Sequence, residues 1–447
     1  MTAFGPPPSI RNMSTSPVFR RGLFALFTAW LALVSLASPA SAAPGDLDPS
    51  FGGDGKVITN FSPGLDEGTD VAIQADGKVV VAGGAAGRFA VARYEMDGSL
   101  DDSFSGNGKV KTNFTGGADR ALGVAIQTNG KIVVAGIHGI GANATFALVR
   151  YTPDGGLDPS FGGDGKVKTN FTQSIDGAND VAIQADGKIV AAGLAGAVPL
   201  AHTGSFALAR YRPNGSLDGT FGGDGKVRTN FSDDLDVALG VALQANGKIV
   251  TAGSSGGINP AFALARHRPN GTLDDSFGGD GKVKTNFSPF GAEDQAHDLA
   301  IQADGRIVAV GLAREPDFAF ALVRYHRDGS LDTSFGGDGK VRTNFGSPDL
   351  DQANDVAIQA DGRIVAAGSA NGDSPPRGTF ALVRYEADGS LDDSFGGGGK
   401  LTTNFSDGFD GASGVALHAD GRIVAAGVAD DTDVSDPTFA VARYLVA

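Results

Sequence analysis

The chain has 447 residues, among them 68 Gly, 20 Pro and no Cys, and its formal net charge is −15. The negative charge argues against nucleic acid and anionic membranes as partners, and the lack of Cys excludes disulfides and thiolate metal sites. With few amphipathic helical patterns, the composition favours many short strands joined by turns.

The first residues have the features of an export signal. Arg20 and Arg21 precede an uncharged apolar stretch over residues 22–36, and residues 40–42 read Ala-Ser-Ala, the small-residue pattern of a cleavage site. We expect residues 1–42 to be a cleaved signal peptide, with an uncleaved anchor as the alternative. Residues 43–447 are then the mature protein, which we expect to be a monomer that is secreted, periplasmic or held at the cell surface, outside the membrane.

One sequence block recurs seven times along the mature part. Its first copy is L-D-P-S-F-G-G-D-G-K over residues 47–56. Its phenylalanines are Phe51, Phe104, Phe161, Phe221, Phe277, Phe335 and Phe395. Each unit is too short to bury a core alone, so neighbouring units must pack against one another.

Each unit contains four runs that resemble strands. In the first complete unit they are residues 71–74, 78–83, 89–94 and 109–114, and Asp-Gly or Asn-Gly joins the first two runs in every unit. That dipeptide is the strongest short-range signal for a hairpin. Seven four-stranded antiparallel units predict an all-β, seven-bladed β-propeller, because radial closure leaves only short sheet edges.

The phase of the repeat predicts how the ring closes. The mature part begins with a lone fourth strand at residues 56–61 and ends with the first three strands of the last unit. We therefore expect the N-terminal strand to pair with the C-terminal strand and complete the last blade.

Two blocks of the repeat resemble a known family. L-D-x-S-F-G-G-D-G-K-V followed by T-N-F, and V-A-I-Q-A-D-G-K-I-V-x-A-G, are similar to the delta-60 repeats of bacterial exported proteins over residues 46–447. The resemblance implies a propeller-type repeat, and it implies no activity and no ligand.

An acidic residue stands just ahead of the first strand of each unit. The seven are Asp66, Asp119, Asp176, Asp236, Asp294, Asp351 and Asp410. Four residues later each unit carries Asp, as at Asp70, or Gly, as at Gly123. Carboxylates near a central axis could coordinate Ca²⁺, which prefers oxygen ligands, or they could cap backbone N–H groups of the loop. Calcium is the one cofactor that this pattern suggests.

Arginine and aspartate recur together as a second charged set. An Arg lies on the third strand of every unit, as at Arg93, and an Asp lies in every L-D-x-S-F turn, as at Asp101. The pattern predicts one Arg–Asp pair in each blade, with a role in the scaffold.

Length variation is confined to two connections of each unit, from the second to the third strand and from the fourth strand to the next blade. Both emerge on one face, here called the variable-loop face; the opposite, uniform face has tight turns and is expected to leave little room for a pocket. Binding surfaces are usually built on variable loops, with drift as the alternative. The last long loop carries Asp430, Asp431, Asp433 and Asp436, which favours a cationic ligand, a divalent ion or a protein as partner.

No catalytic motif is present, and the six His residues form no metal-binding group, although His138, His202 and His297 are expected on the variable-loop face. The sequence therefore predicts a non-enzymatic binding or scaffold propeller. One alternative is a hydrolase or lyase that uses paired carboxylates, such as Asp66 and Asp70, in the axial funnel. The other is a structural surface protein.

Overall fold

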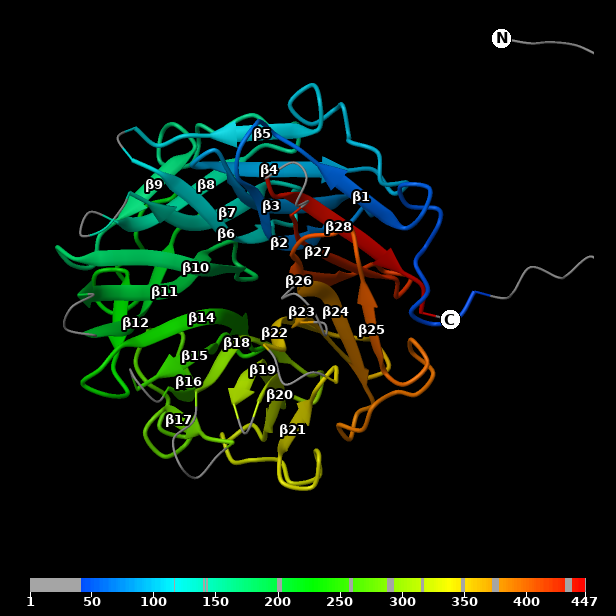
Figure 1. Ribbon diagram of the computed structural model, residues 1–447. Coiled ribbons are helices and arrows are strands. Elements are labelled where there is room, and N and C mark those ends of the chain that lie inside the picture. The colour runs from blue at the N-terminus through cyan, green and yellow to red at the C-terminus, as the bar shows by residue number, and fades with distance from the viewer. Residues whose placement is uncertain are drawn as a thin grey trace, which may run out of the picture. The chain divides into compact units, whose positions relative to one another are not determined.

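The computed structural model describes residues 42–446 except 116, 140, 142–143, 199–202, 257–259, 288–292, 315–316, 347–349, 372–377 and 431–435. These residues form seven four-stranded sheets arranged around one axis (Figure 1). The predicted all-β, seven-bladed propeller is confirmed. Within the described ranges, no helix is both long and apolar enough to cross a membrane. Residues 1–41, which hold almost all of the expected signal peptide, lie outside the described residues.

Each blade runs from an innermost strand at the axis to an outer strand at the rim. The innermost strands are β2 (Asp66–Ile73), β6 (Asp119–Ile126), β10 (Ile175–Ile183), β14 (Asp236–Leu243), β18 (Asp294–Ile301), β22 (Gln352–Ile358) and β26 (Asp410–Leu417). The second strands are β3 (Val79–Ala85), β7 (Ile132–His138), β11 (Ile189–Val198), β15 (Ile249–Ser255), β19 (Ile307–Arg314), β23 (Ile364–Asn371) and β27 (Ile423–Ala429).

The outer half of each blade is as regular as the inner half. The third strands are β4 (Arg88–Tyr94), β8 (Thr145–Tyr151), β12 (Thr203–Tyr211), β16 (Ala261–His267), β20 (Phe318–Tyr325), β24 (Gly378–Tyr385) and β28 (Thr438–Tyr444). The outer strands are β5 (Lys109–Thr112), β9 (Lys166–Thr169), β13 (Lys226–Thr229), β17 (Lys282–Thr285), β21 (Lys340–Thr343), β25 (Lys400–Thr403) and β1 (Lys56–Thr59). Blades 1 to 6 follow chain order from β2, and blade 7 is β26, β27, β28 and β1.

The two ends of the chain close the ring in blade 7. Strand β1 pairs antiparallel with β28, and Lys56 stands opposite Ala442. Asp48 forms an ion pair with Arg443 (Nε–Oδ2 2.8 Å), and its backbone N–H donates to the carbonyl of Arg443. Hydrogen bonds and a buried ion pair thus both hold the N-terminal segment to the C-terminal strand.

The apolar core lies between the blades. Each cluster joins two neighbours; for example, Phe89 and Val91 of blade 1 pack with Val124 and Ile132 of blade 2. The same arrangement crosses the closure, where Phe439 of blade 7 packs in one cluster with strands of blade 1. Because an isolated blade would leave both sheet faces wet, the ring folds as one structure.

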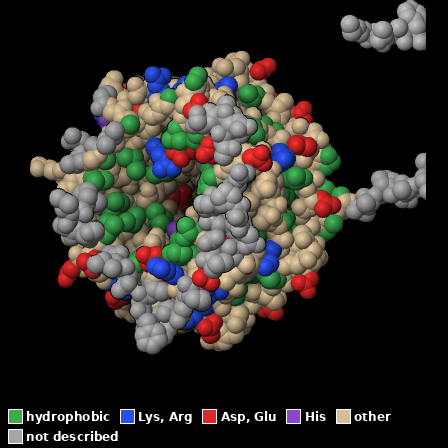
Figure 2. Space-filling model, in the orientation of Figure 1, with side chains coloured by type: hydrophobic (Ala, Val, Ile, Leu, Met, Phe, Trp, Pro, Cys, Tyr) green, Lys and Arg blue, Asp and Glu red, His purple; other side chains and the backbone are tan. Residues whose placement is uncertain are grey.

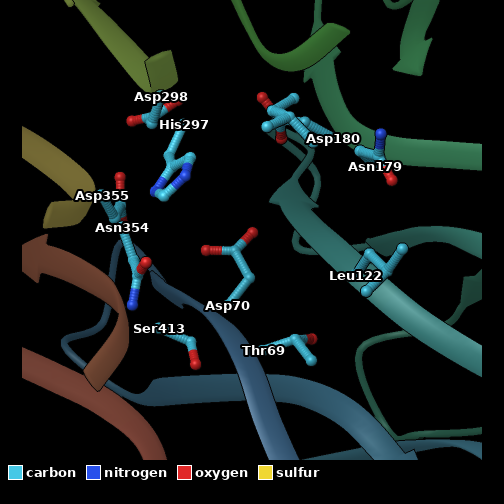
Figure 3. Close-up of a pocket in the computed structure, with 11 residues that line it drawn as sticks. Thr69, Asp70, Leu122, Asn179, Asp180, His297, Asp298, Asn354, Asp355 and Ser413 are labelled. Carbon is cyan, nitrogen blue, oxygen red and sulfur yellow. The ribbon is translucent and has the colours of Figure 1, made fainter. Parts of the chain in front are cut away.

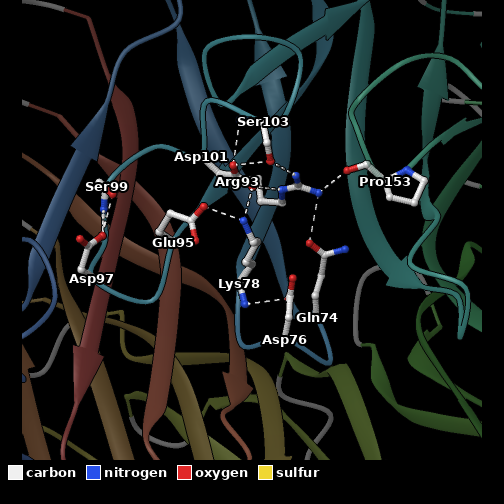
Figure 4. A network of polar contacts seen from close by, with 10 residues as sticks. All are labelled: Gln74, Asp76, Lys78, Arg93, Glu95, Asp97, Ser99, Asp101, Ser103 and Pro153. Atoms are coloured by element: carbon white, nitrogen blue, oxygen red, sulfur yellow. Dashed lines mark hydrogen bonds and ion pairs between the residues drawn. The ribbon is translucent and has the colours of Figure 1, made fainter.

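The predicted Arg–Asp pair is present in every blade, and in six of the seven blades its arginine also donates to a carbonyl of the next blade; Figure 4 shows the network of blade 1. In blade 1, Arg93 Nε donates to Asp101 Oδ2 at 2.6 Å, Nη2 donates to Ser103 Oγ, and Nη1 donates to the carbonyl of Pro153 in blade 2. The guanidinium lies over the Phe104 ring, 4.6 Å from its centroid. The other pairs are Arg150–Asp158, Arg210–Asp218, Arg266–Asp274, Arg324–Asp332, Arg384–Asp392 and Arg443–Asp48.

The innermost strands start earlier than expected and contain a bulge. The sequence predicted a first strand at residues 71–74, but β2 begins at Asp66. Gly68 pairs with Gly83 and Asp70 pairs with Ala82, so no residue of β3 stands opposite Thr69 in the register, although its Oγ1 lies 3.1 Å from the carbonyl of Ala82. Such an extra residue bends the strand and turns side chains in a new direction. Equivalent register shifts occur in all seven innermost strands.

Candidate functional site

The seven bulges surround a small polar cavity on the propeller axis (Figure 3). Its volume is about 100 Å³. The lining residues are the bulge residue of each blade together with the aspartates that follow four of them: Thr69, Asp70, Leu122, Asn179, Asp180, Leu239, His297, Asp298, Asn354, Asp355 and Ser413. The local fold of the innermost strands therefore builds this site.

The polar bulge residues reach across to the next blade. Asn179 Nδ2 donates to the carbonyl of Ala238 at 2.7 Å, and Asn354 Nδ2 donates to the carbonyl of Ala412 at 2.7 Å. Thr69 Oγ1 lies 3.1 Å from the carbonyl of Ala121 and makes the same kind of contact. These hydrogen bonds join neighbouring blades at the axis and fix the cavity wall.

The axial aspartates accept backbone N–H groups from two blades. Asp70 Oδ1 accepts from Val71 in its own strand at 2.7 Å, and its Oδ2 accepts from Val124 in blade 2 at 2.6 Å. Asp180 repeats this pattern at blades 3 and 4, where its Oδ2 accepts from Val241 at 2.7 Å. Each carboxyl is thereby held in a fixed orientation beside the cavity.

The axial carboxyls carry no cationic partner. No Lys or Arg is found among the described residues that line the cavity. Burial raises the pKa of Asp180 to about 7. Burial, reinforced by repulsion from Asp355 and Asp180, raises the pKa of Asp70 well above its usual range, and burial also raises the pKa values of Asp298 and Asp355. Desolvation without a neutralising cation is the common cause.

His297 is the only imidazole among the described lining residues. Its Nδ1 lies 2.8 Å from the carbonyl of Ala353, which can only accept, so Nδ1 carries the proton. Burial lowers the pKa of His297, so the ring is neutral near pH 7 and does not offset the carboxylates. The sequence placed His297 on the variable-loop face; it lies instead in β18, at the axis. His138 contacts Asp119, and His202 lies outside the described residues.

Apolar side chains stand where the variable loops enter the innermost strands. In five blades an apolar residue comes directly before the recurring aspartate of the set that begins with Asp66. These residues are Leu65, Ile175, Leu235, Leu350 and Phe409. Leu65, Leu350 and Phe409 are 59%, 55% and 43% exposed. Figure 2 shows a hollow at the centre of this face, with acidic side chains at its depth and both hydrophobic and charged side chains along its mouth. The site is therefore an acidic cavity below a mouth that is partly apolar.

Arginine side chains on the innermost strand and at the end of a second strand are paired with glutamates. Arg120 Nε lies 2.5 Å from Glu67 Oε1, and Arg314 Nη1 lies 3.5 Å from Glu293 Oε2. These pairs neutralise cations on the variable-loop side of blades 1, 2 and 5. They do not supply charge to the axial carboxyls.

The seven aspartates that the sequence offered as calcium ligands cap loops. In each blade the carboxylate accepts the backbone N–H of the phenylalanine that ends the T-N-F block. Asp66, for example, accepts from Phe61 at 2.7 Å and from Ser62 at 3.1 Å. These residues do not line the axial cavity, contrary to the expectation that they lie near the axis, and Asp66 is not paired with Asp70 there. Calcium binding at this set stays a prediction.

The described part of the chain contains no group of three or more His, Cys, Asp or Glu side chains that could hold a metal ion. Of the acidic loop residues, Asp430 is tied to the neighbouring loop, since its N–H donates to the carbonyl of Phe409 at 2.8 Å. Asp436 is described and partly exposed, whereas Asp431 and Asp433 lie outside the described residues. Their role as a partner-binding group stays a prediction.

The uniform face does contain cavities, so the expectation of little room there is wrong. Three lie between the hairpins of consecutive blades, with volumes of about 660, 460 and 480 Å³. Pro153, Pro213 and Pro269 stand at the walls of these cavities in turn. Tight turns of fixed length leave gaps between blades because neighbouring sheets diverge from the axis.

Six segments of the repeats match a family model. The family described as "Domain of unknown function (DUF5122) beta-propeller" matches residues 74–104, 127–161, 184–221, 244–277, 302–335 and 359–395. This chain is a β-propeller repeat protein. Each matched segment of the propeller runs from the end of an innermost strand to the phenylalanine of the L-D-x-S-F turn. The family description gives the fold and no activity.

Solved structures similar to the propeller include enzymes and a protein of unknown function. Virginiamycin B lyase from Staphylococcus aureus is 9% identical with a TM-score of 0.48, over 87% of this chain and 98% of that chain. A protein of unknown function from Dyadobacter fermentans is 11% identical with a TM-score of 0.45, over 88% and 98%. A gluconolactonase from Xanthomonas campestris is 17% identical with a TM-score of 0.38, over 74% and 95%. Similarities this low carry no argument about function. No curated protein matches the chain.

Proposed function

We propose that this propeller is an exported, non-enzymatic binding protein that holds a cationic ligand in the axial cavity beneath its variable-loop face. Export is supported by the signal-like residues 1–42 and by the similarity of the repeats to delta-60 repeats of exported proteins. The formal net charge of −15 favours the approach of cations.

The observation that carries the proposal is the set of four axial aspartates without a cationic neighbour. One other set of buried aspartates is paired with arginine, as Asp101 is with Arg93, and the loop-capping set accepts backbone N–H groups of its own loop, as Asp66 does. The four axial aspartates are half-buried and surround one small cavity, so each negative charge raises the cost of the others. A proton or a cation from outside the chain would relieve this repulsion.

An organic ammonium fits the site better than a metal ion does. The axial oxygens already accept backbone N–H groups, and a carboxylate keeps further lone pairs that an ammonium N–H can use. The described residues bring no three potential ligands together for a metal. The exposed Leu65, Leu350 and Phe409 offer an apolar surface to the carbon portion of such a ligand. We therefore propose a primary ammonium with an aliphatic or aromatic tail.

Calorimetric titration of the full mature chain tests this proposal. The probes are n-butylammonium, the neutral n-butanol of similar shape, and Ca²⁺. We expect n-butylammonium to bind with one site per chain and n-butanol to bind at least tenfold more weakly. Asp180→Asn should weaken n-butylammonium binding by about 10- to 100-fold, because a charge-assisted hydrogen bond is worth about 1.5–3 kcal/mol.

The matched control is Asp54→Asn, which removes one negative charge from an exposed turn (the Asp54 side chain is 63% exposed). Its n-butylammonium affinity should stay within about twofold of wild type, because exposed charges are screened at moderate salt. Equal binding of n-butanol and n-butylammonium, or equal losses in both variants, would contradict an axial cation site. If only Ca²⁺ binds, with one ion per chain, the ligand of the site is a metal ion and the ammonium proposal is wrong.

A second candidate function is favoured by the place of Asp180, which lines the axial cavity and whose pKa burial raises to about 7. A carboxyl with such a pKa can exchange protons at neutral pH and could act as a general acid or base in a hydrolase or lyase. This alternative predicts turnover of the bound ligand, whereas the binding proposal predicts that the ligand is recovered unchanged. Mass analysis of a ligand after long incubation separates the two.

A further inference from the structure

The position after each bulge alternates between aspartate and glycine around the ring. In blade order the residues are Asp70, Gly123, Asp180, Gly240, Asp298, Asp355 and Gly414. The glycines make room for the aspartate of the following blade. A Cβ on Gly240 would lie 2.5 Å from Asp298 Oδ1, and one on Gly123 would lie 2.9 Å from the Cα of Asp180. A side chain at these positions would push the neighbouring aspartate out of place.

Seven blades cannot alternate perfectly, because seven is odd. The break falls between blades 5 and 6, where Asp298 stands beside Asp355 instead of a glycine. Asp298 Oδ2 lies 3.3 Å from the N–H of Val356, whereas Asp70 and Asp180 make the equivalent bonds at 2.6 and 2.7 Å. The same N–H also donates to Asp355 Oδ1 at 2.6 Å. The two carboxyls thus compete for one donor.

Asp298 Oδ2 and Asp355 Oδ1 meet at the single N–H of Val356, which brings the two carboxyls together at one point of the cavity wall. Two carboxylates held this close repel each other, and one proton kept by the pair relieves that repulsion. The other titratable groups facing the pair are Asp70, Asp180 and His297, and none of them supplies a positive charge near pH 7. A pair of carboxyls held together in this way retains one proton where separate carboxyls would lose both.

We propose that Asp298 and Asp355 share one proton in the free protein and that a cation entering the axial cavity displaces it. The inference rests on the proposed function and adds its regulation. The O–H bond of the pair breaks, the proton passes to solvent, and the positive charge of the ligand replaces it. Binding then exchanges one cation for one proton, and the cavity keeps its net charge.

The test is calorimetry of n-butylammonium binding in buffers that differ in ionisation enthalpy. We expect the wild type to release about one proton per bound cation near neutral pH, and its affinity to rise about tenfold per pH unit while the pair holds its proton. Asp298→Gly removes the shared pair and should lower the release, while Asp70 and Asp180, whose pKa values are also raised, can still contribute. Asp180→Asn is the matched control: it weakens binding but keeps the shared pair, so it should lower the release less than Asp298→Gly does.

Infrared spectroscopy of the free protein gives a second readout that needs no ligand. If the two residues share one proton, the free protein has a carboxylic-acid C=O band that either Asp298→Gly or Asp355→Gly weakens. The double variant should then lose no more of this band than each single variant does. Additive losses, or binding without proton release in the wild type, would overturn the inference while leaving the binding function intact. Absence of n-butylammonium binding at every pH would overturn the proposed function and the exchange, and the infrared result would still decide the shared proton.

Discussion

Replacing Asp48 by Asn should separate the two ends of the chain. Asp48 is 3% exposed, and its Oδ2 lies 2.8 Å from Arg443 Nε and 2.9 Å from Arg422 Nη1. Although its burial alone acts in the opposite direction, Ser50, Arg422 and Arg443 hold the pKa of Asp48 well below its usual range, so the residue is ionised in the folded protein. Asp48→Asn keeps the shape but leaves the buried Arg443 without its counter-charge.

Removing one partner of a buried ion pair costs about 3–5 kcal/mol, a large part of the roughly 5–15 kcal/mol that stabilises a typical domain. Urea unfolding should show this loss, and hydrogen exchange should rise over residues 43–61 before the other blades open. Asp158→Asn removes the same pair from blade 2 and should cost a similar amount without loosening residues 43–61. Asp54→Asn should change stability by less than about 1 kcal/mol. If Asp48→Asn behaves like Asp54→Asn, the ion pair does not hold the ring closed.

Three further predictions concern single positions. Gly240→Ala should lower the free energy of unfolding by about 1–3 kcal/mol, because the added Cβ would lie 2.5 Å from Asp298. Gly219 is exposed, and a Cβ there would have its nearest contact at 3.6 Å, so Gly219→Ala should leave thermal unfolding nearly unchanged. His267→Tyr restores the residue of the other blades and should raise the free energy of unfolding by about 0.5–2 kcal/mol. The wild type should lose stability as the pH falls from 6.5 to 4, because burial lowers the pKa of His267 to about 4 and the unfolded chain takes up the proton first. His267→Tyr should remove this loss. The raised pKa of Asp180 has the opposite effect: the stability it contributes is present below about pH 4 and is lost as the pH rises to about 7, at about 1.4 kcal/mol per unit of pKa difference. In Asp180→Asn the urea midpoint should therefore depend less on pH over that range. Unchanged pH profiles in the His267 and Asp180 variants would refute both assignments.

Much of the scaffold could be predicted because its signals are local and repeated. The glycine of the Asp-Gly dipeptide closes the hairpin with a positive φ, 86° at Gly77, whereas the aspartate before it lacks the positive φ that a primed turn requires. The phase of the repeat predicted the pairing of β1 with β28. The capping role of Asp66 was one of two readings, and the structure shows the hydrogen bonds that it requires.

The axial site could not be predicted, because it depends on strand register. Only the shift between Gly68 and Asp70 turns Thr69 and Asp70 into the cavity, and a bulge is set by pairing with the neighbouring strand. The sequence offered the seven capping carboxylates as possible calcium ligands near the axis and Asp70 with Asp66 as an alternative pair in the axial funnel; of these, only Asp70 lines the cavity. The alternation of Asp and Gly could be read from the sequence. That each glycine makes room for the aspartate of the next blade could not, because Gly240 and Asp298 are brought together only by the packing of neighbouring blades.

A crystal structure of the mature chain soaked in n-butylammonium tests the central claim most directly. We predict one ammonium nitrogen within hydrogen-bonding distance of the Asp70 and Asp180 carboxyls, with its carbon chain directed toward the variable-loop face. The Asp180→Asn protein, soaked in the same way, should show a weaker or absent ligand. A cation bound only on the uniform face, or an axial cavity that holds water alone at saturating n-butylammonium, would contradict the account.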